Sequence, residues 1–166
     1  MNAADRCILD HFARVRSRTI ELARQLPDDL LARTAEGEEQ SLFWLLVHIA
    51  DGPNWWMTHV MKDGGTWACP PPCSKDRASL LDGLAASRDR LVRFFEADGG
   101  RQMGETFCMR HDDGSAEQWT GRERVLYYTD HELHHRGRIV LALLQWGLGA
   151  LLGPAWLWPP TADSAS

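Results

Sequence analysis

The segment TGRERVLYYTDHELHHRGR, residues 120–138, opens with a clear helix start. Thr120 is suited to cap a helix, and the Glu123 side chain, three residues later, can accept a hydrogen bond from the Thr120 N–H; this S/T-x-x-E pattern is a capping box. No proline follows before Pro154, so no residue of that kind interrupts the helix once it has started. We therefore expect a long last helix around which other parts of the chain must pack.

Two histidines on this predicted helix are spaced to share one ligand. His131 and His135 are one turn apart, about 40° on a helical wheel, so both imidazoles can reach a single ion. Glu132 and His134 flank the line between them, each about 80° from its centre on the same wheel. The pattern favours a metal-binding helix, with Glu132 as a candidate general base or as a residue that supports the ligands.

The string HELHH also satisfies the H-E-x-x-H pattern of zinc proteases. In those enzymes the two histidines bind zinc, the glutamate is the general base, and a third ligand usually comes from downstream. No His or Glu occurs after His135, and the only downstream carboxylate side chain is Asp163. A third ligand must come from upstream, which disfavours the protease interpretation.

The best upstream donor is His48, which lies in the apolar run SLFWLLVHIADGPNWW. Ser41 is a good N-cap for this run, and its apolar content is too high for a helix that faces solvent, so we expect a central helix. Within such a helix a polar ring needs a partner. That partner is a metal ion in one interpretation and a carbonyl group in the other. Gly52-Pro53 predicts a kink or a break one turn after His48.

The arrangement as a whole resembles a known family. An apolar capped helix carrying His48, a long intervening segment and H-x-x-x-H-R-G on the last helix are similar to the DinB-like (damage-inducible) family of metal-binding helical bundles, which includes thiol-dependent transferases. The resemblance runs from about Asp5 to about Pro154. It implies that His48, His131 and His135 together bind one divalent ion. The position after Gly137, often Gln in the family, is Arg138 here.

Length and charge narrow the class of protein. The 166 residues fit a single domain, residues 1–166, with a disordered tail from about residue 160. A net charge of −5 and the absence of a long Lys/Arg run argue against nucleic acid as a partner. The N-terminus is interrupted by charge every few residues, so it is neither a secretory signal nor a membrane span, and we expect a cytoplasmic protein with no membrane partner. The four cysteines are expected to be thiols, Cys69 and Cys73 included.

The remaining elements complete the predicted fold. Helices are expected over residues 5–25 and 77–97, and two short extended pieces around Asp113-Gly114 precede the last helix. The Gly/Pro-rich stretch 62–75 is typical of a long crossover connection between non-adjacent helices. We predict an all-α four-helix bundle with this long crossover between the second and third helices, and with a small extended insert before the last helix.

The last helix is also apolar on the side opposite its two histidines. The residues on that side are Leu126, Leu133, Val140 and Leu144. Such a helix is either enclosed by its own chain or packed against a second copy, so a homodimer is plausible. Trp156 and Trp158 in the C-terminal segment are expected to cover the bundle or the dimer contact.

Three neutral imidazoles leave a divalent ion with open positions for water or a substrate thiolate. Zinc and nickel suit imidazole best among the likely ions. With Glu132 beside the ligands and Arg138 placed to hold a substrate carboxylate, the sequence favours a metal-dependent enzyme. It would act on a small molecule, by transferring or adding a low-molecular-weight thiol or by hydrolysis. The alternative is a non-catalytic bundle with a structural metal or histidine cluster.

Overall fold

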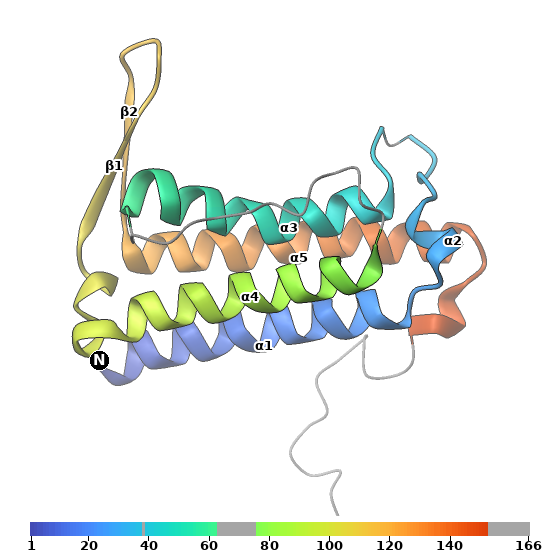
Figure 1. Ribbon diagram of the computed structural model, residues 1–166, viewed down its shortest axis with the longest axis horizontal. Helices are drawn as coiled ribbons and strands as arrows, with labels where there is room; N and C mark the ends of the chain where they lie inside the picture. The colour runs from blue at the N-terminus through green and yellow to red at the C-terminus, as the bar shows by residue number, and fades with distance from the viewer. Residues whose placement is uncertain (38, 63–75, 153–166) are drawn as a thin grey trace, which may run out of the picture.

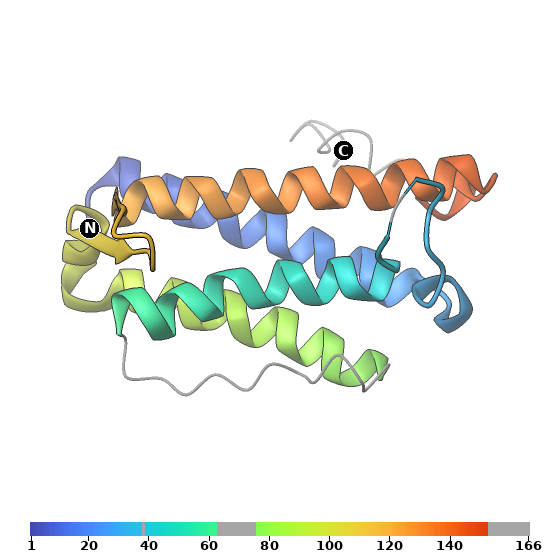
Figure 2. The same ribbon diagram turned by 90° about the horizontal axis from the view of Figure 1, so that it is seen from above.

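The computed structural model describes residues 1–37, 39–62 and 76–152, and four long helices dominate these ranges. They are α1 (Ala3–Gln25), α3 (Leu42–Trp56), α4 (Arg77–Glu96) and α5 (Gly121–Gln145). Helix α1 packs against α4 and α5, and α3 packs against the same two helices from the other side (Figures 1 and 2). The shorter helical elements are α2 (Asp28–Leu31), a π-helix (Met57–Met61) and two 3-10 segments (Ala97–Met103 and Gly149–Leu152).

The predicted helix starts are confirmed by their caps. The Thr120 hydroxyl accepts a hydrogen bond from the Glu123 N–H, and the Glu123 carboxylate accepts one from the Thr120 N–H at 2.7 Å. The Ser41 hydroxyl caps α3 by accepting a hydrogen bond from the Trp44 N–H. Each such cap is worth about 1 kcal/mol. The caps therefore explain why the two helices that carry histidines begin where they do.

A small antiparallel hairpin precedes α5, as the sequence predicted. Strand β1 (Thr106–Arg110) pairs with β2 (Ala116–Thr120), with Thr106 opposite Thr120. Gly114 has a φ of 85° in the connecting turn, a conformation that glycine adopts without strain. The hairpin projects from one end of the helices, and β2 leads directly into α5 (Figure 1).

The buried interior contains two clusters of apolar side chains, and buried polar residues lie between the members of the two clusters in the sequence. One cluster includes Leu26, Leu46, Leu84 and Leu143, and the other includes Phe12, Trp56, Phe95 and Tyr128. Among the buried polar residues between these positions in sequence are Arg16 on α1, Ser87 on α4 and Glu132 on α5. Arg16 and Glu132 form a salt bridge of 2.7 Å whose side chains are 0% and 1% exposed.

The prediction of a kink or break at Gly52-Pro53 is wrong as regards the break. Helix α3 runs through the buried Pro53 to Trp56, and the π-helix follows without an intervening loop. Pro53 has no N–H to donate to the carbonyl of Ile49, four residues earlier. The Arg16 Nη2 donates to that carbonyl at 3.0 Å instead. Because the carbonyl keeps a partner, the helix tolerates the proline.

The described residues are mostly helical with one two-stranded sheet, so the predicted all-α class holds in its broad form. None of the helices within the described ranges is long and apolar enough to cross a membrane. Cys7 and Cys108 are free, exposed thiols, as expected. The predicted crossover, residues 62–75, lies outside the described residues except for Lys62. The predictions for Cys69, Cys73, Trp156, Trp158 and the tail from residue 160 also concern positions outside the described residues.

Candidate metal centre

Three histidine side chains from two helices converge on one point. His48 comes from α3, and His131 and His135 come from α5. The Nε2 atom of His131 lies 3.1 Å from that of His48 and 3.1 Å from that of His135. One potential ligand atom from each ring lies within 4.8 Å of the other two. The structure thus brings together the three residues that the sequence singled out as ligands.

The antiparallel packing of α3 and α5 produces this convergence. The two helices run in opposite directions (Figures 1 and 2), and the contacts between them follow: Tyr128 donates a hydrogen bond to the Gly52 carbonyl at 3.1 Å, and one turn further along α5, His131 meets His48. Since His135 is one helical turn beyond His131, its ring reaches the same point. His48 therefore supplies the third imidazole although it lies 83 residues before His131.

The spacing and tilt of the rings fit one divalent ion. Two nitrogens about 2.0–2.1 Å from a zinc ion, separated by a tetrahedral angle, lie about 3.3 Å apart. The two observed separations of 3.1 Å are close to this value. The His48 ring is tilted by 59° from the His131 ring and by 89° from the His135 ring. The rings therefore do not stack on one another, and it is the nitrogen separations that place their ligand atoms around a common point.

All three histidines are held in the neutral form that binds metals. Burial lowers the pKa of His131 to about 4, with further lowering by His48, His134, Arg16 and Arg124. Burial, followed by the neighbouring histidines, also lowers the pKa of His135 to about 4. The pKa of His48 is lowered by burial and raised in part by the charge of Asp51. At neutral pH each imidazole therefore offers an unprotonated nitrogen, which metal binding requires.

An aromatic ring stacks on a histidine of each helix. The Trp44 ring lies 4.9 Å from the His48 ring, centroid to centroid, and the two planes differ by 12°. The Tyr127 ring lies 5.9 Å from the His131 ring with planes 23° apart. In each case the aromatic residue precedes its histidine by four positions, which places both on the same face of the helix. Both aromatic side chains are exposed.

A buried arginine, Arg124, lies against the Tyr127 ring at the hairpin end of the site. The guanidinium carbon of Arg124 is 4.6 Å from the ring centroids of both Trp56 and Tyr127, and it also contacts Trp119 and Tyr128. Its Nε donates a hydrogen bond to the Tyr128 hydroxyl at 3.3 Å. Cation–π contacts of this kind hold the aromatic side chains in place around a fixed positive charge.

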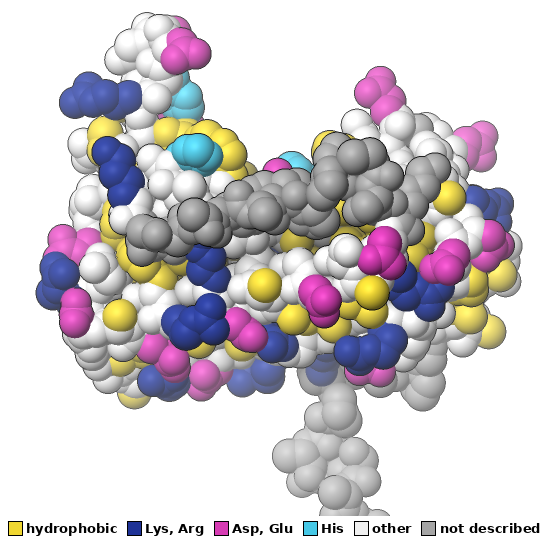
Figure 3. Space-filling model, viewed as in Figure 1, with side chains coloured by type: hydrophobic (Ala, Val, Ile, Leu, Met, Phe, Trp, Pro, Cys, Tyr) yellow, Lys and Arg dark blue, Asp and Glu magenta, His cyan; other side chains and the backbone are white. Residues whose placement is uncertain are grey.

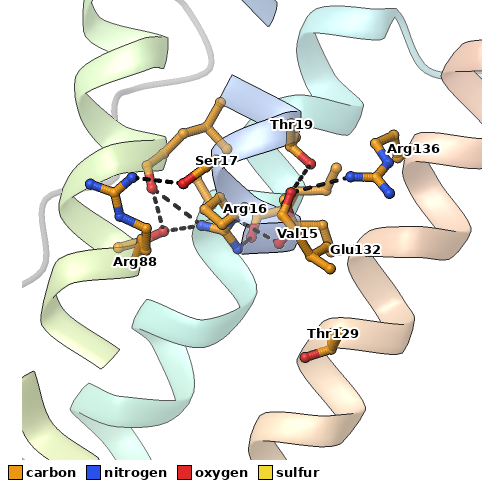
Figure 4. Close-up of polar contacts among 12 residues, drawn as sticks. Val15, Arg16, Ser17, Thr19, Arg88, Thr129, Glu132 and Arg136 are labelled. Carbon is orange, nitrogen blue, oxygen red and sulfur yellow. Dashed lines mark hydrogen bonds and ion pairs between the residues drawn. The ribbon is translucent and has the colours of Figure 1, made fainter. Parts of the chain in front are cut away.

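Glu132 lies among the helices and not in the group of ligand atoms. Its Oε2 accepts a hydrogen bond from the Arg16 Nε, and its buried Oε1 has no hydrogen-bond partner among the described residues (Figure 4). Arg16 also donates to the carbonyls of Leu84 and Ile49 and to the Ser87 hydroxyl. This network joins all four long helices, and two of its members, Ile49 and Glu132, are the neighbours of His48 and His131 in sequence.

A family model described as the DinB family matches residues 1–151, most of the chain. This chain belongs to the DinB family. Comparison with curated proteins gave no match. The resemblance drawn from His48 and the H-x-x-x-H-R-G segment is confirmed by the family match, and the three histidines of this DinB protein lie close enough together to hold a metal ion.

The other residues singled out in the sequence occupy distinct places in this DinB protein. His134 is exposed, with its ring centroid 5.0 Å from that of His135, and it is not part of the metal-ligand group found among the described residues. Arg138 is half-buried, and its Nη1 donates to the His135 Nδ1 at 3.4 Å. Arg138 is therefore beside the centre, whereas Glu132 lies in the helix interface.

Sequence reasoning missed the roles of Arg16 and Arg124 in the DinB chain. Arg16 lies in a stretch with Arg14 and Arg18, and nothing local distinguishes it from those residues. The useful signal was Pro53, which leaves the Ile49 carbonyl without a donor inside an apolar helix. For Arg124 the signal was the four-residue spacing of Arg124 and Tyr128, which places the guanidinium against the aromatic ring.

Proposed function

We propose that this DinB-family protein binds one divalent cation, zinc or nickel, through His48, His131 and His135, and that it is a metal-dependent enzyme. Its substrate would be a small molecule, and the reaction the transfer or addition of a low-molecular-weight thiol, or a hydrolysis. The observation that carries this proposal is the convergence of three neutral imidazole nitrogens with no fourth protein ligand in the group formed by the described residues.

A three-histidine donor set is typical of catalytic centres, whereas structural zinc sites usually have four protein ligands. A divalent ion held in this way supplies a Lewis acid with positions open to a substrate. Access from solvent supports this interpretation, because His48 and His131 are only half-buried. The surface is hollowed between the β1–β2 hairpin and the segment before α3, and histidine side chains are visible in that hollow (Figure 3).

We propose that Arg138 binds an anionic group of the substrate. When the His135 Nε2 coordinates an ion, the proton of the neutral ring lies on Nδ1, which then donates and no longer accepts. The Arg138 Nη1, now 3.4 Å from that Nδ1, must give up this hydrogen bond. With an ion on His135, the Arg138 Nη1 would lose this one acceptor, and a substrate carboxylate would be a suitable replacement.

Glu132 has two proposed roles, a general base or a support for the ligands, and its surroundings favour the second. A general base must reach the proton it abstracts, directly or through one water. The Glu132 carboxylate is bonded to Arg16 and buried between helices, and that contact fixes α5 relative to α1. We infer that Glu132 acts as a positioning residue that holds the segment carrying His131 and His135.

The proposal is tested with the full-length protein loaded with Co²⁺, which absorbs visible light according to its coordination. Addition of a small thiol such as 2-mercaptoethanol is expected to produce a sulfur-to-cobalt charge-transfer band, because a coordination position is open. Arg138→Ala is expected to leave the cobalt content and this band unchanged and to weaken binding of 3-mercaptopropionate, whose carboxylate needs a cation. A cobalt spectrum that does not respond to any thiol would favour a closed structural site.

A further inference from the structure

Two exposed aromatic rings flank the candidate metal centre from opposite directions. Trp44 on α3 and Tyr127 on α5 each precede a histidine by one helical turn. Because α3 and α5 are antiparallel (Figures 1 and 2), the residue one turn before His48 and the residue one turn before His131 lie on opposite sides of the site along the helix axes. Trp44 therefore lies toward the end of the site where α5 continues to Arg138, and Tyr127 lies toward the end where α3 continues to Gly52.

The stacking geometry places these rings alongside whatever group binds the ion. An ion coordinated by an imidazole nitrogen lies in the plane of that imidazole. The Trp44 plane is within 12° of the His48 plane, and the Tyr127 plane is within 23° of the His131 plane. The Trp44 and Tyr127 rings are therefore nearly parallel to the imidazole planes in which a bound ion would lie. A flat ligand group that binds the ion and extends in either imidazole plane would lie beside an aromatic face.

Both rings have surface left to bury. Trp44 is 39% exposed and Tyr127 is 41% exposed. Large apolar side chains exposed together near a concave centre are a recurrent feature of small-molecule sites, where a few polar groups fix the orientation of the ligand. The Tyr127 ring is also held in place, since it contacts the Trp119 ring at 5.7 Å and the Arg124 guanidinium at 4.6 Å. A fixed ring loses little conformational freedom when a ligand packs on it.

Positive charge lies at both ends of this arrangement. Arg124 is buried against Tyr127, and Arg138 contacts His135. Among the described residues, the Asp51 carboxylate opposes this charge at His48, and the Glu132 carboxylate is paired with Arg16. With a divalent ion between them, the two arginines favour a ligand whose metal-binding group is anionic. The aromatic faces favour a body that is flat and hydrophobic.

We propose that the centre takes a flat, hydrophobic small molecule with one anionic metal-binding group, whose body packs against Trp44 or Tyr127. This inference rests on the proposed function, because it assumes an ion with an open position. The substrate would be an aromatic or otherwise planar acid or thiolate, in preference to a saturated or strongly hydrophilic one. Trp44 and Tyr127 are then the residues that determine specificity.

Hydroxamates provide the probes, since one anionic head can carry different bodies. Acetohydroxamate reports the ion alone, benzohydroxamate adds a flat ring, and cyclohexanecarbohydroxamate adds a ring of similar size that is not flat. Titration calorimetry on the zinc-loaded full chain is expected to show benzohydroxamate binding about 10-fold more tightly than either of the others. The benzohydroxamate-to-acetohydroxamate ratio should fall at least about fivefold in Trp44→Ala or Tyr127→Ala, with zinc content unchanged.

The matched control is Leu126→Ala. Leu126 is adjacent to Tyr127 and equally exposed, at 42%, but it lies on the opposite side of α5 from the histidines. The control should keep the wild-type ratio. Trp44→Leu and Tyr127→Leu, which retain apolar volume without a flat ring, should lower the ratio as the alanine variants do. An unchanged ratio in all four variants would overturn the inference while acetohydroxamate binding leaves the metal proposal standing. A zinc-loaded wild type that binds none of the three hydroxamates would instead overturn the proposed function.

Discussion

Arg16 on α1 replaces the hydrogen-bond donor that Pro53 removes from α3. The Arg16 Nη2 lies 3.0 Å from the carbonyl oxygen of Ile49, the position four residues before Pro53. The same guanidinium bonds Glu132 on α5 through its Nε. One side chain therefore supports the helix that carries His48 and holds the helix that carries His131 and His135. The fold and the candidate metal centre depend on the same buried cation.

Loss of the Arg16 guanidinium should lower the free energy of unfolding. Part of this loss should depend on Pro53. Arg16→Met leaves the Glu132 carboxylate buried without a counter-charge, and we expect the free energy of unfolding to fall by about 3–5 kcal/mol. In this background Pro53→Ala restores a backbone N–H for the Ile49 carbonyl and should recover about 1 kcal/mol. Urea denaturation of the single and double variants measures both effects.

Pro53→Ala in the wild-type background is the control for this experiment. There Pro53→Ala brings a second donor to a carbonyl that Arg16 already satisfies, so the gain should be smaller. The difference between the two backgrounds is the coupling energy between residues 16 and 53. If Pro53→Ala has the same effect with and without Arg16, the guanidinium is not what compensates for the proline.

The metal-free protein should lose stability in mild acid. The folded pKa values of His131 and His135, about 4, lie below the ordinary value of 6.5. Between these values the two histidines bind more protons in the unfolded chain than in the folded chain, so their contribution lowers stability as pH drops from about 6.5 to about 4 and is constant below that range. Melting temperatures measured with a chelator present, from pH 7.5 to pH 4, report this slope.

A single substitution isolates the contribution of the centre to that slope. His131→Gln removes one of the depressed pKa values and relieves His135 of a neighbouring histidine. The variant should therefore show a shallower loss of melting temperature between pH 6.5 and pH 4 than the wild type. His11→Gln, on the exposed side of α1, is the control and should keep the wild-type slope. Equal slopes for His131→Gln and wild type would contradict the depressed pKa.

The outward side of α5 predicts self-association. Leu126, Leu133 and Leu144 are exposed along this side, and Leu144 is 54% exposed. Exposed leucines that recur along one side of a helix are typical of an interface, so we expect a homodimer at high micromolar concentration, with Leu133→Lys shifting the equilibrium toward monomer. Light scattering measures the mass directly. A wild-type mass near the monomer value of 18.8 kDa at that concentration would count against the dimer.

The local parts of the site could be predicted from the sequence. The one-turn spacing of His131 and His135 follows from helix geometry, and the Thr120 cap fixes where their helix begins. His48 required the family resemblance, because nothing local says which distant helix packs against α5. The burial of Glu132 was not predicted: a wheel places it to one side of the ligand line but does not say that α1 lies there with Arg16.

The unbroken course of α3 was missed for a related reason. Proline rules describe a helix in isolation, where the freed carbonyl has only water as an alternative partner. In the folded chain Arg16 arrives from a segment 33 residues away from Ile49. Tertiary contacts of this kind override local preference. The sequence shows Arg16 and Pro53 but does not show that Arg16 reaches the Ile49 carbonyl.

His48, His131 and His135 are expected to bind one divalent ion together, and the metal content of single-histidine variants measures this. His48→Ala should lose zinc or nickel as completely as His135→Ala, since either leaves two imidazoles, and affinity should fall by more than about 100-fold. The stabilisation of about 2.7 kcal/mol expected for the wild type at 100 times its Kd should disappear in both variants. His134→Ala should keep both the ion and the stabilisation. Mass spectrometry that finds the metal retained in His48→Ala and lost in His134→Ala would contradict the account.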